Sequence, residues 1–114
     1  MSRWVRILAW ASVGWAVACA SPTLPLPPPS VPSESRIDAT HVLLSSVQGV
    51  EANAIVVLYN RNPAVSLQDR VAGAQADGQG TWSQTILASK GDQIDITQEF
   101  GNTKSPPVTI EIDP

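Results

Sequence analysis

The stretch Val108-Thr109-Ile110-Glu111-Ile112 decides the fold class of this chain, because apolar and polar residues alternate in it without a break. A period of two places one face of a β-strand in a core and the other in water. Thr109, Glu111 and Asp113 share the polar face. The same period recurs in Ile94-Asp95-Ile96 and continues less cleanly to Phe100. The alternation predicts strands with one buried face.

Two other runs, Val42–Val47 and Ile55–Tyr59, are denser in Val, Ile and Leu and predict more central strands. Turn residues separate these runs, and no stretch shows a helical period. The turns are Asn60-Arg61-Asn62-Pro63, Asp77-Gly78-Gln79-Gly80, Lys90-Gly91-Asp92 and Gly101-Asn102. We therefore expect one all-β domain over residues 37–114, built as a sandwich or barrel.

The order of short motifs along this region resembles the bacterial immunoglobulin-like domains of surface and adhesion proteins. The resemblance implies a small Greek-key β-sandwich of seven strands or slightly fewer, which serves as a structural spacer or adhesive module and not as an enzyme. Asn53 stands where the family usually has Gly, and Asn tolerates a positive φ better than most residues. The motifs are Val47-Gln-Gly49, Ala54-Ile-Val-Val-Leu-Tyr-Asn60, Asp77-Gly-Gln-Gly-Thr-Trp-Ser83, Gly91-Asp92 and Gly101-Asn-Thr-Lys-Ser105.

Trp82 can be interpreted in two ways. A lone tryptophan can be a platform on which a sugar stacks, whereas the resemblance implies a core position at the start of a strand. A small domain that keeps only Tyr59, Trp82 and Phe100 as aromatic residues needs large side chains in its core. The core interpretation is the favoured one.

The beginning of the chain has the layout of an export signal. Arg3 and Arg6 precede an apolar stretch, Ile7–Ala18, that is too short to span a bilayer and ends on small residues. The residues Ala16-Val17-Ala18-Cys19 resemble a bacterial lipobox, which implies a signal peptide over 1–18 and lipidation of Cys19. The alternative is ordinary cleavage after Ala18 or Ala20, since both fit the small-x-small rule.

Cys19 is the only cysteine, so an exported domain with this sequence cannot form an internal disulfide. Lipidation explains its position best. In the lipoproteins that the signal resembles, a residue other than Asp after the cysteine implies the outer membrane, and Ala20 stands there. We expect a protein of the bacterial cell envelope, or a secreted or periplasmic one if Cys19 is not lipidated.

Residues 19–36 are predicted to form the lipidated cysteine and a disordered proline-rich tether. Six prolines between 20 and 36 favour an extended polyproline II spacer, up to roughly 50 Å long at ~3.1 Å per residue. The alternative is a ligand for a partner's groove, because Pro25-x-x-Pro28 fits a PxxP pattern. No basic residue flanks this motif, so the spacer is favoured.

The charge and the titratable residues leave little room for other chemistry. Without residues 1–18 the chain has five basic and ten acidic residues, a formal charge of −5, and no basic patch for nucleic acid. His41, the one histidine, is predicted to be a surface or capping residue. Oxygen ligands for calcium exist in Asp77, Asp92, Asp95 and Glu99, but their spacing favours solvated acids on turns and strand faces. We expect no catalytic residue, no metal and no cofactor.

These observations predict a membrane-anchored, non-enzymatic envelope lipoprotein. Its immunoglobulin-like domain would have a structural or protein-interaction role, as an accessory subunit of an envelope assembly, with a sheet edge as a candidate contact surface. The alternative is an adhesive module that binds carbohydrate or a host or cell surface directly.

Overall fold

β-strands make up nearly all the regular secondary structure of the described chain. The computed structural model describes residues 25–113, so Cys19 and the predicted signal peptide lie outside the described residues. The elements are β1 (Ser33–Arg36), β2 (His41–Ser46), β3 (Ile55–Asn60), α2 (Leu67–Arg70), β4 (Val71–Gln75), β5 (Trp82–Leu87), β6 (Gln93–Phe100), β7 (Thr103–Lys104) and β8 (Val108–Glu111).

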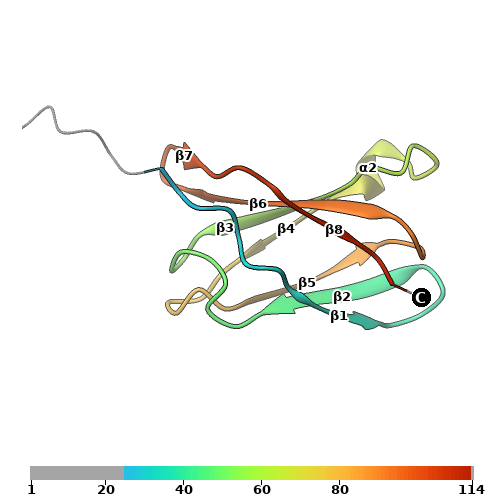
Figure 1. Cartoon of the computed structure of the whole chain (residues 1–114), viewed down its shortest axis with the longest axis horizontal. Helices are drawn as coiled ribbons and strands as arrows, with labels where there is room; N and C mark the ends of the chain where they lie inside the picture. The colour runs from blue at the N-terminus through green and yellow to red at the C-terminus, as the bar shows by residue number, and fades with distance from the viewer. Residues whose placement is uncertain (1–24, 114) are drawn as a thin grey trace, which may run out of the picture.

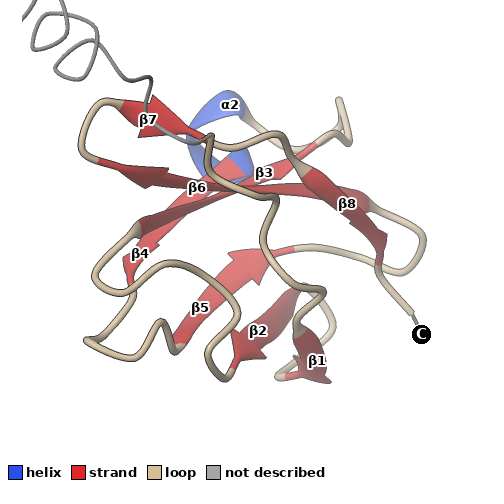
Figure 2. Cartoon of the chain, turned by 60° about the vertical axis from the view of Figure 1, so that its left-hand side comes forward, coloured by secondary structure: helices blue, strands red, loops and turns tan. Residues whose placement is uncertain are grey.

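The strands form two antiparallel sheets that stack face to face (Figure 1). One sheet has the order β1-β2-β5. The other has the order β4-β3-β6, and β7 and β8 pair with different parts of β6. Viewed from a second direction, the two sheets remain separate layers, with the short helix at one end (Figure 2). The all-β prediction is confirmed, and the architecture is a sandwich of two sheets.

The alternating sequences place their apolar faces as predicted. Ile94 and Ile96 of β6 are fully buried, whereas Thr109 and Glu111 of β8 are exposed. The two dense runs are central strands, since β2 lies between β1 and β5 and β3 lies between β4 and β6. Inner and outer faces are therefore fixed by the period of two along each strand.

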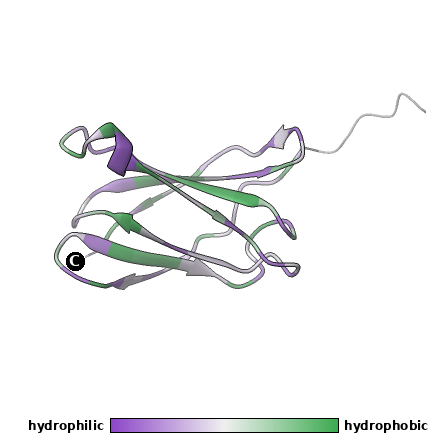
Figure 3. Ribbon diagram, turned by 180° about the vertical axis from the view of Figure 1, so that it is seen from behind, coloured by the Kyte–Doolittle hydropathy of each residue, from purple (hydrophilic) through white to green (hydrophobic). Residues whose placement is uncertain are grey.

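The core lies between the sheets and is made mostly of aliphatic side chains. Trp82 belongs to it and is only 3% exposed, so the core interpretation of this residue is confirmed. Hydropathy colouring shows apolar segments along the strands, while α2 is mainly hydrophilic (Figure 3). The buried cluster consists of Val42, Leu44, Val56, Leu58, Ala76, Trp82, Ile86, Ala88, Ile94, Ile96 and Ile112.

The folded part of the chain begins earlier than the sequence predicts. Residues 33–36, assigned to the spacer, form β1 and pair with β2 along its length. Pro29 and Pro32 are buried, and Pro27 accepts a hydrogen bond from Gln98 Nε2 at 2.8 Å. The later part of the predicted spacer, residues 27–36, packs against the domain in this structure. Its prolines end at Pro32, and the four residues that follow are free to pair with β2.

Two short elements were not expected. The helix α2 is a single turn, which is too short to produce a helical period in the sequence. The strand β4, with the sequence Val-Ala-Gly-Ala-Gln, consists mostly of residues with weak strand preference. Within residues 25–113, no helix is long and apolar enough to cross a membrane.

The connection into β3 depends on a left-handed residue. Asn53 has φ of 63°, in the region that Asn tolerates better than most residues. Its N–H donates to the carbonyl oxygen of Asp77 at 2.9 Å, and Ala76 N–H donates to Ala54 O at 2.8 Å. These bonds tie the entry of β3 to the end of β4.

Candidate interaction surface

The outer face of the five-stranded sheet carries a group of apolar side chains that no other described element covers. Ile55, Val57 and Tyr59 point outward from β3, and Val71 lies opposite Tyr59 on β4. Ile55 is 43% exposed, Tyr59 38% and Val71 52%, while Val57 is half-buried. We call these four residues the apolar strip. Exposed apolar groups that are contiguous on one face are typical of interaction sites.

A polar network borders the strip on β6 and β8. Arg61 Nε donates to Asp95 Oδ2 at 2.8 Å, and Thr109 Oγ1 donates to Asp95 Oδ1 at 2.6 Å. Asp95 lies opposite Tyr59 in the strand register. An apolar centre with a polar rim is the usual composition of a protein–protein interface.

Electrostatics keeps this rim ionised. Partial burial raises the pKa of Asp95, but the hydrogen bonds from Arg61 and Thr109 and the charge of Arg61 outweigh it, so the pKa lies below its usual range. The hydrogen bond to Asp95 raises the pKa of Arg61. Because the pair is exposed, its contribution to folding stability is small.

Beside the strip, β4 forms one edge of its sheet. Ala76 N–H donates to Ala54 O, so Ala76 and Ala54 face each other as a hydrogen-bonded pair. Such pairs alternate along an antiparallel ladder, and therefore Ala72 and Ala74 also direct their N–H and C=O groups toward β3. The backbone groups of Val71, Gly73 and Gln75 then point away from the sheet. All three residues are exposed.

The outer face of the other sheet has a different character. Its exposed and half-buried positions carry mainly hydroxyl side chains, with two half-buried leucines among them. The positions are Ser33, Ser35, His41, Leu43, Ser45, Ser83, Thr85 and Leu87. The apolar strip therefore distinguishes the β4-β3-β6 face from the opposite one.

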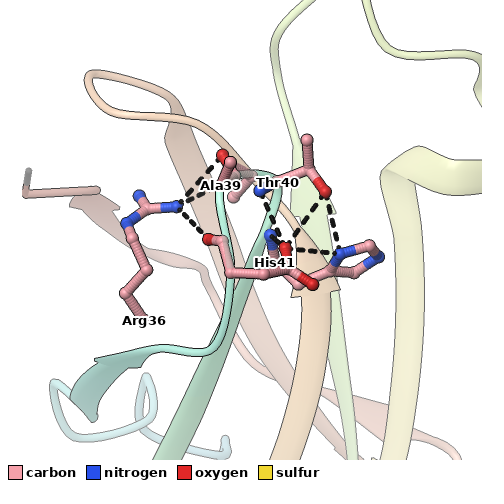
Figure 4. A network of polar contacts seen from close by, with 6 residues as sticks. Arg36, Ala39, Thr40 and His41 are labelled. Carbon is pink, nitrogen blue, oxygen red and sulfur yellow. Dashed lines mark hydrogen bonds and ion pairs between the residues drawn. The ribbon is translucent and has the colours of Figure 1, made fainter.

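His41 is the first residue of β2 and takes part in a local hydrogen-bond network with the turn before it (Figure 4). Asp38 Oδ1 accepts hydrogen bonds from the backbone N–H groups of Thr40 and His41, both at 2.8 Å, and lies 3.0 Å from His41 Nδ1. These bonds, first the one from Thr40 N–H and then the side-chain one from His41, lower the pKa of Asp38 to about 2. His41 thus stabilises the β1–β2 turn, as its predicted surface or capping role implies.

Asp92 departs from the expected solvated acid. It is 8% exposed, and its carboxylate accepts hydrogen bonds from Asn60 Nδ2 at 3.0 Å, Asn62 Nδ2 at 2.9 Å and Ser89 N–H at 2.9 Å. Burial raises its pKa, but these bonds outweigh burial and hold the pKa below its usual range. The carboxylate is a buried link between the end of β3 and the β5–β6 turn.

The other proposed calcium ligands do not come together. Asp77 accepts hydrogen bonds from Gln79 and Thr81 N–H within its own turn, and Asp95 is paired with Arg61 on the outer sheet face. In the part of the chain that the structure describes, no three His, Cys, Asp or Glu side chains gather where they could hold a metal ion.

A shallow hollow of ≈ 420 Å³ lies beside Trp82, but the indole is not its platform. Trp82 is buried in the core, and its Nε1 has no hydrogen-bond partner among the described residues. The idea of Trp82 as a surface for sugar stacking is therefore wrong. The hollow is lined by Ser45, Ser46, Val47, Gln75, Asp77, Thr81, Trp82 and Ser83.

The structure does not bring the site residues predicted from the sequence together. The lipidation site Cys19 lies outside the described residues. Part of Pro25-x-x-Pro28 is held against the domain, because Gln98 binds the carbonyl of Pro27. The apolar strip was missed as a site, although the outward positions of the dense run Ile55–Tyr59 were a readable signal. The β4 edge gave no such signal, because β4 itself was not predicted.

Comparison with other proteins assigns no family to this chain. No family model matches it, and no curated protein is significantly similar to it in sequence. Its function must therefore be argued from the surface described above.

Proposed function

We propose that this chain is a membrane-anchored, non-enzymatic lipoprotein of the bacterial cell envelope, and that its immunoglobulin-like domain binds a partner protein through the apolar strip. The observation that carries the proposal is the exposure of Ile55, Tyr59 and Val71 together on one sheet face. Leaving this apolar area in water is unfavourable, whereas a partner with an apolar surface of its own would cover it. The rim of Arg61, Asp95 and Thr109 would fix its orientation.

The strand order supports the immunoglobulin-like assignment. A β1-β2-β5 sheet faces a β4-β3-β6-β8 sheet, and the chain changes sheets between β2 and β3, between β4 and β5, and between β5 and β6. In an immunoglobulin sandwich the first two strands pair with the fifth, and the third pairs with the sixth, as they do here. Such Greek-key sandwiches serve many functions, so the fold alone names none.

The position of the folded segment supports a short tether. Gln98 Nε2 binds the carbonyl oxygen of Pro27, and Ser30 N–H donates to Gly49 O at 3.0 Å. Seven residues separate Cys19 from Pro27. At ~3.1 Å per residue they would hold the domain within roughly 25 Å of an acyl anchor at Cys19, about half the reach expected from the sequence.

This tether would also orient the domain. The described chain begins beside β7, at the end of the sandwich opposite the C-terminus (Figure 1). With an anchor at Cys19, the β7 end would face the membrane. The β1–β2 turn, α2 and the C-terminus would point outward, and the apolar strip would lie on a side wall open to a neighbouring envelope protein.

Two measurements test the proposal. In the producing bacterium, processing that is sensitive to globomycin and lost in Cys19→Ala would support lipidation, and normal processing of Cys19→Ala would refute it. Crosslinking in intact envelopes should then link wild type to a defined protein. Tyr59→Ser should abolish this link and Ser83→Glu, on the other sheet, should leave it unchanged. Equal crosslinking of Tyr59→Ser and wild type would contradict the role of the strip.

The adhesive alternative is distinguished by the ligand. Tyr59 is an exposed aromatic ring beside the hydrogen-bonding groups of Arg61, Asp95 and Thr109, a combination that could also contact a sugar. Binding of the domain to a glycan array, abolished by Tyr59→Ser and with no protein crosslink in the envelope, would favour this second function.

A further inference from the structure

The edges of the two sheets differ in how they are protected against pairing with another chain. An exposed edge strand offers unpaired N–H and C=O groups, and natural proteins guard it with charges, prolines or covering segments. β1 carries Glu34 and Arg36 and follows Pro32. The β7–β8 edge is interrupted by Pro106 and Pro107. Both of these edges are guarded.

At the free edge of β5, one backbone group is already hydrogen-bonded to a side chain of the same strand. Ala88 N–H donates to Thr40 O, so the alternation of hydrogen-bonded pairs with β2 leaves the backbone groups of Ser83, Thr85 and Leu87 pointing away from β2. One of these groups, the carbonyl oxygen of Thr85, accepts a hydrogen bond from Gln84 Nε2 at 3.0 Å. A partner strand could pair here only by displacing that side chain.

β4 has none of these protections. Its sequence, Val-Ala-Gly-Ala-Gln, contains no charge and no proline. The free backbone groups are the N–H and C=O of Gly73 and Gln75 and the C=O of Val71, whose N–H belongs to the last turn of α2. Gly73 is exposed and has no side chain, so its backbone itself is open to solvent at the centre of the edge.

The fold does not require glycine at position 73. Its φ is not in the left-handed region, and the nearest atom to an added Cβ would be the carbonyl oxygen of Val56 at 3.7 Å, an ordinary van der Waals distance. A glycine inside a strand weakens it and often marks a place where another backbone approaches closely. Among the described strands none pairs with β4 on its edge side, so a backbone that pairs there would come from another chain.

We propose that β4 pairs antiparallel with β4 of a second copy of this chain, with Gly73 of both copies on the two-fold axis. In this register Gly73 faces Gly73 of the second copy, and Val71 faces Gln75 of the second copy on either side. The Gly73 pair exchanges two hydrogen bonds and each Val71–Gln75 pair forms one, from Gln75 N–H to Val71 O, so the seam forms about four hydrogen bonds. The two β-sheets become one continuous sheet.

Self-complementarity favours a second copy as the occupant. The free groups at positions 71, 73 and 75 are symmetric about Gly73, as an isologous contact requires. The domain is acidic, yet the seam places no like charges opposite each other, because β4 carries none. The pairing also brings the two apolar strips onto the same face of the joined sheet, which doubles the area offered to a partner.

The strength of this contact depends on the proposed anchoring, and in this sense the inference rests on the proposed function. Five residues of strand pairing bury far less than the ~1,200 Å² of a stable interface, so the free domain is a weak dimer. Two copies confined to one membrane have a high effective concentration, which converts a weak contact into a populated one.

Disulfide trapping in native envelopes tests the pairing. Hydrogen-bonded cross-strand residues have Cα atoms about 5.5 Å apart, which a disulfide can span. Gly73→Cys should therefore give a disulfide-linked dimer under mild oxidation, with about ten-fold more product than Ser83→Cys on the β5 edge, because only β4 is paired. The wild-type chain, whose only cysteine is Cys19, is the control that shows how much disulfide-linked dimer forms through Cys19.

The register has its own test. When a Val71→Cys chain and a Gln75→Cys chain are expressed together with different tags, mixed dimers should form. Each expressed alone should give little product, because its introduced thiols lie about four residues apart across the seam, or roughly 13 Å. Mixed dimers no more abundant than the single-chain products would contradict the register.

The outcomes separate this inference from the proposed function. A lipidated protein whose Gly73→Cys variant shows no dimer above the Ser83→Cys level overturns self-pairing and leaves the anchor intact. A Gly73→Cys dimer of an unlipidated chain supports self-pairing and refutes the anchor. A disulfide that links the Gly73→Cys variant only to a different protein, with no linked pair of copies, shows that a foreign chain takes this position, which also overturns the proposal.

Discussion

At the scale of single residues, a few carboxylates hold loops that lack regular structure. Asp38 organises the β1–β2 turn by accepting the N–H groups of Thr40 and His41, and Asp77 does the same in the β4–β5 turn. Asp92 is buried and joins two loops through Asn60 and Asn62. In each case the ionised carboxylate is the acceptor, so the turn depends on its charge.

This dependence predicts a loss of stability in acid. The pKa of Asp38 is lowered from 3.8 to about 2 in the folded protein, and the pKa values of Asp77, Asp92 and Asp95 are lowered as well. A group with a depressed folded-state pKa contributes stability above its unfolded pKa and loses it as pH falls through the folded value. Urea unfolding should show stability nearly constant down to about pH 4 and falling between about pH 4 and about pH 2.

Replacing the Asp38 carboxylate with a neutral amide measures how much Asp38 contributes to the loss of stability in acid. Asp38→Asn keeps one acceptor oxygen but does not titrate, so its stability should fall less steeply between about pH 4 and about pH 2 than that of the wild type. Asp113→Asn, which removes an exposed carboxylate near the chain end, is the matched control and should follow the wild-type curve. An Asp38→Asn curve parallel to the wild type would show that Asp38 is not a source of the acid sensitivity.

At the scale of elements, two glycines that look alike in the sequence have opposite roles. Gly73 lies inside β4 with room for a Cβ, whereas Gly80 lies in the β4–β5 turn with φ of +80°. A Cβ on Gly80 would stand 2.1 Å from the carbonyl oxygen of Val50. Glycine is needed at Gly80 for the backbone conformation and for the close approach to Val50, while at Gly73 it only weakens the strand.

The two alanine variants should therefore differ in sign. Gly73→Ala should raise the free energy of unfolding by about 0.5 kcal/mol, because it removes backbone freedom from the unfolded chain. Gly80→Ala should lower it by about 2 kcal/mol or more through a strained φ and a steric clash. Chemical denaturation of the dilute monomer measures both. A destabilised Gly73→Ala monomer would mean that the fold itself requires this glycine.

At the scale of the whole molecule, the segment before β1 is part of the domain. Pro29 and Pro32 are buried, Ser30 binds Gly49, and Gln98 binds Pro27 across 71 positions of the sequence. Gln98 is 2% exposed and also accepts the N–H of Glu51 at 2.7 Å. The carboxamide of Gln98 thus joins the segment before β1 to the β2–β3 loop by hydrogen bonds.

Removing the segment before residue 37 should lower the stability of the domain. A chain of residues 37–114, the domain limits expected from the sequence, lacks β1 and the segment before it and leaves Gln98 without its Pro27 partner. Compared with residues 20–114, it should lose on the order of 3 kcal/mol or more of folding free energy, from lost burial and strand pairing. Urea denaturation of both chains is the measurement, and equal midpoints would show that residues 20–36 add nothing to the fold.

The parts of the fold that the sequence predicted are those with strong local periodicity. β8 alternates strictly and β6 alternates over Ile94-Asp95-Ile96, so their inward faces could be inferred. β2 and β3 are dense in aliphatic residues, so their central places could be inferred. β4 and α2 were missed because five small residues and a single helical turn carry almost no local signal. β1 was missed because the prolines before it are typical of a spacer.

Less of the candidate interaction surface than of the fold could be predicted from the sequence. The dense run in β3 implies that its outward positions are apolar as well, but Val71 joins them only through the register of β4 against β3. The solvated-acid interpretation of Asp92 was wrong because its partners, Asn60 and Asn62, are about 30 positions away in the sequence. Contacts of this kind depend on how separate strands and loops are brought together.

The amino-acid sequence by itself determined the strand class and the inward faces of the alternating strands, because hydrophobic periodicity acts over a few neighbouring residues. The burial of Trp82 could be inferred because a small domain needs its few large side chains in the core. Only the tertiary structure decided that the chain folds from Pro27 onward, that Asp92 is buried, and that β4 is an unguarded edge beside the apolar strip. These features arise from pairings between distant segments, and the free energy of such pairings is a property of the assembled sheets.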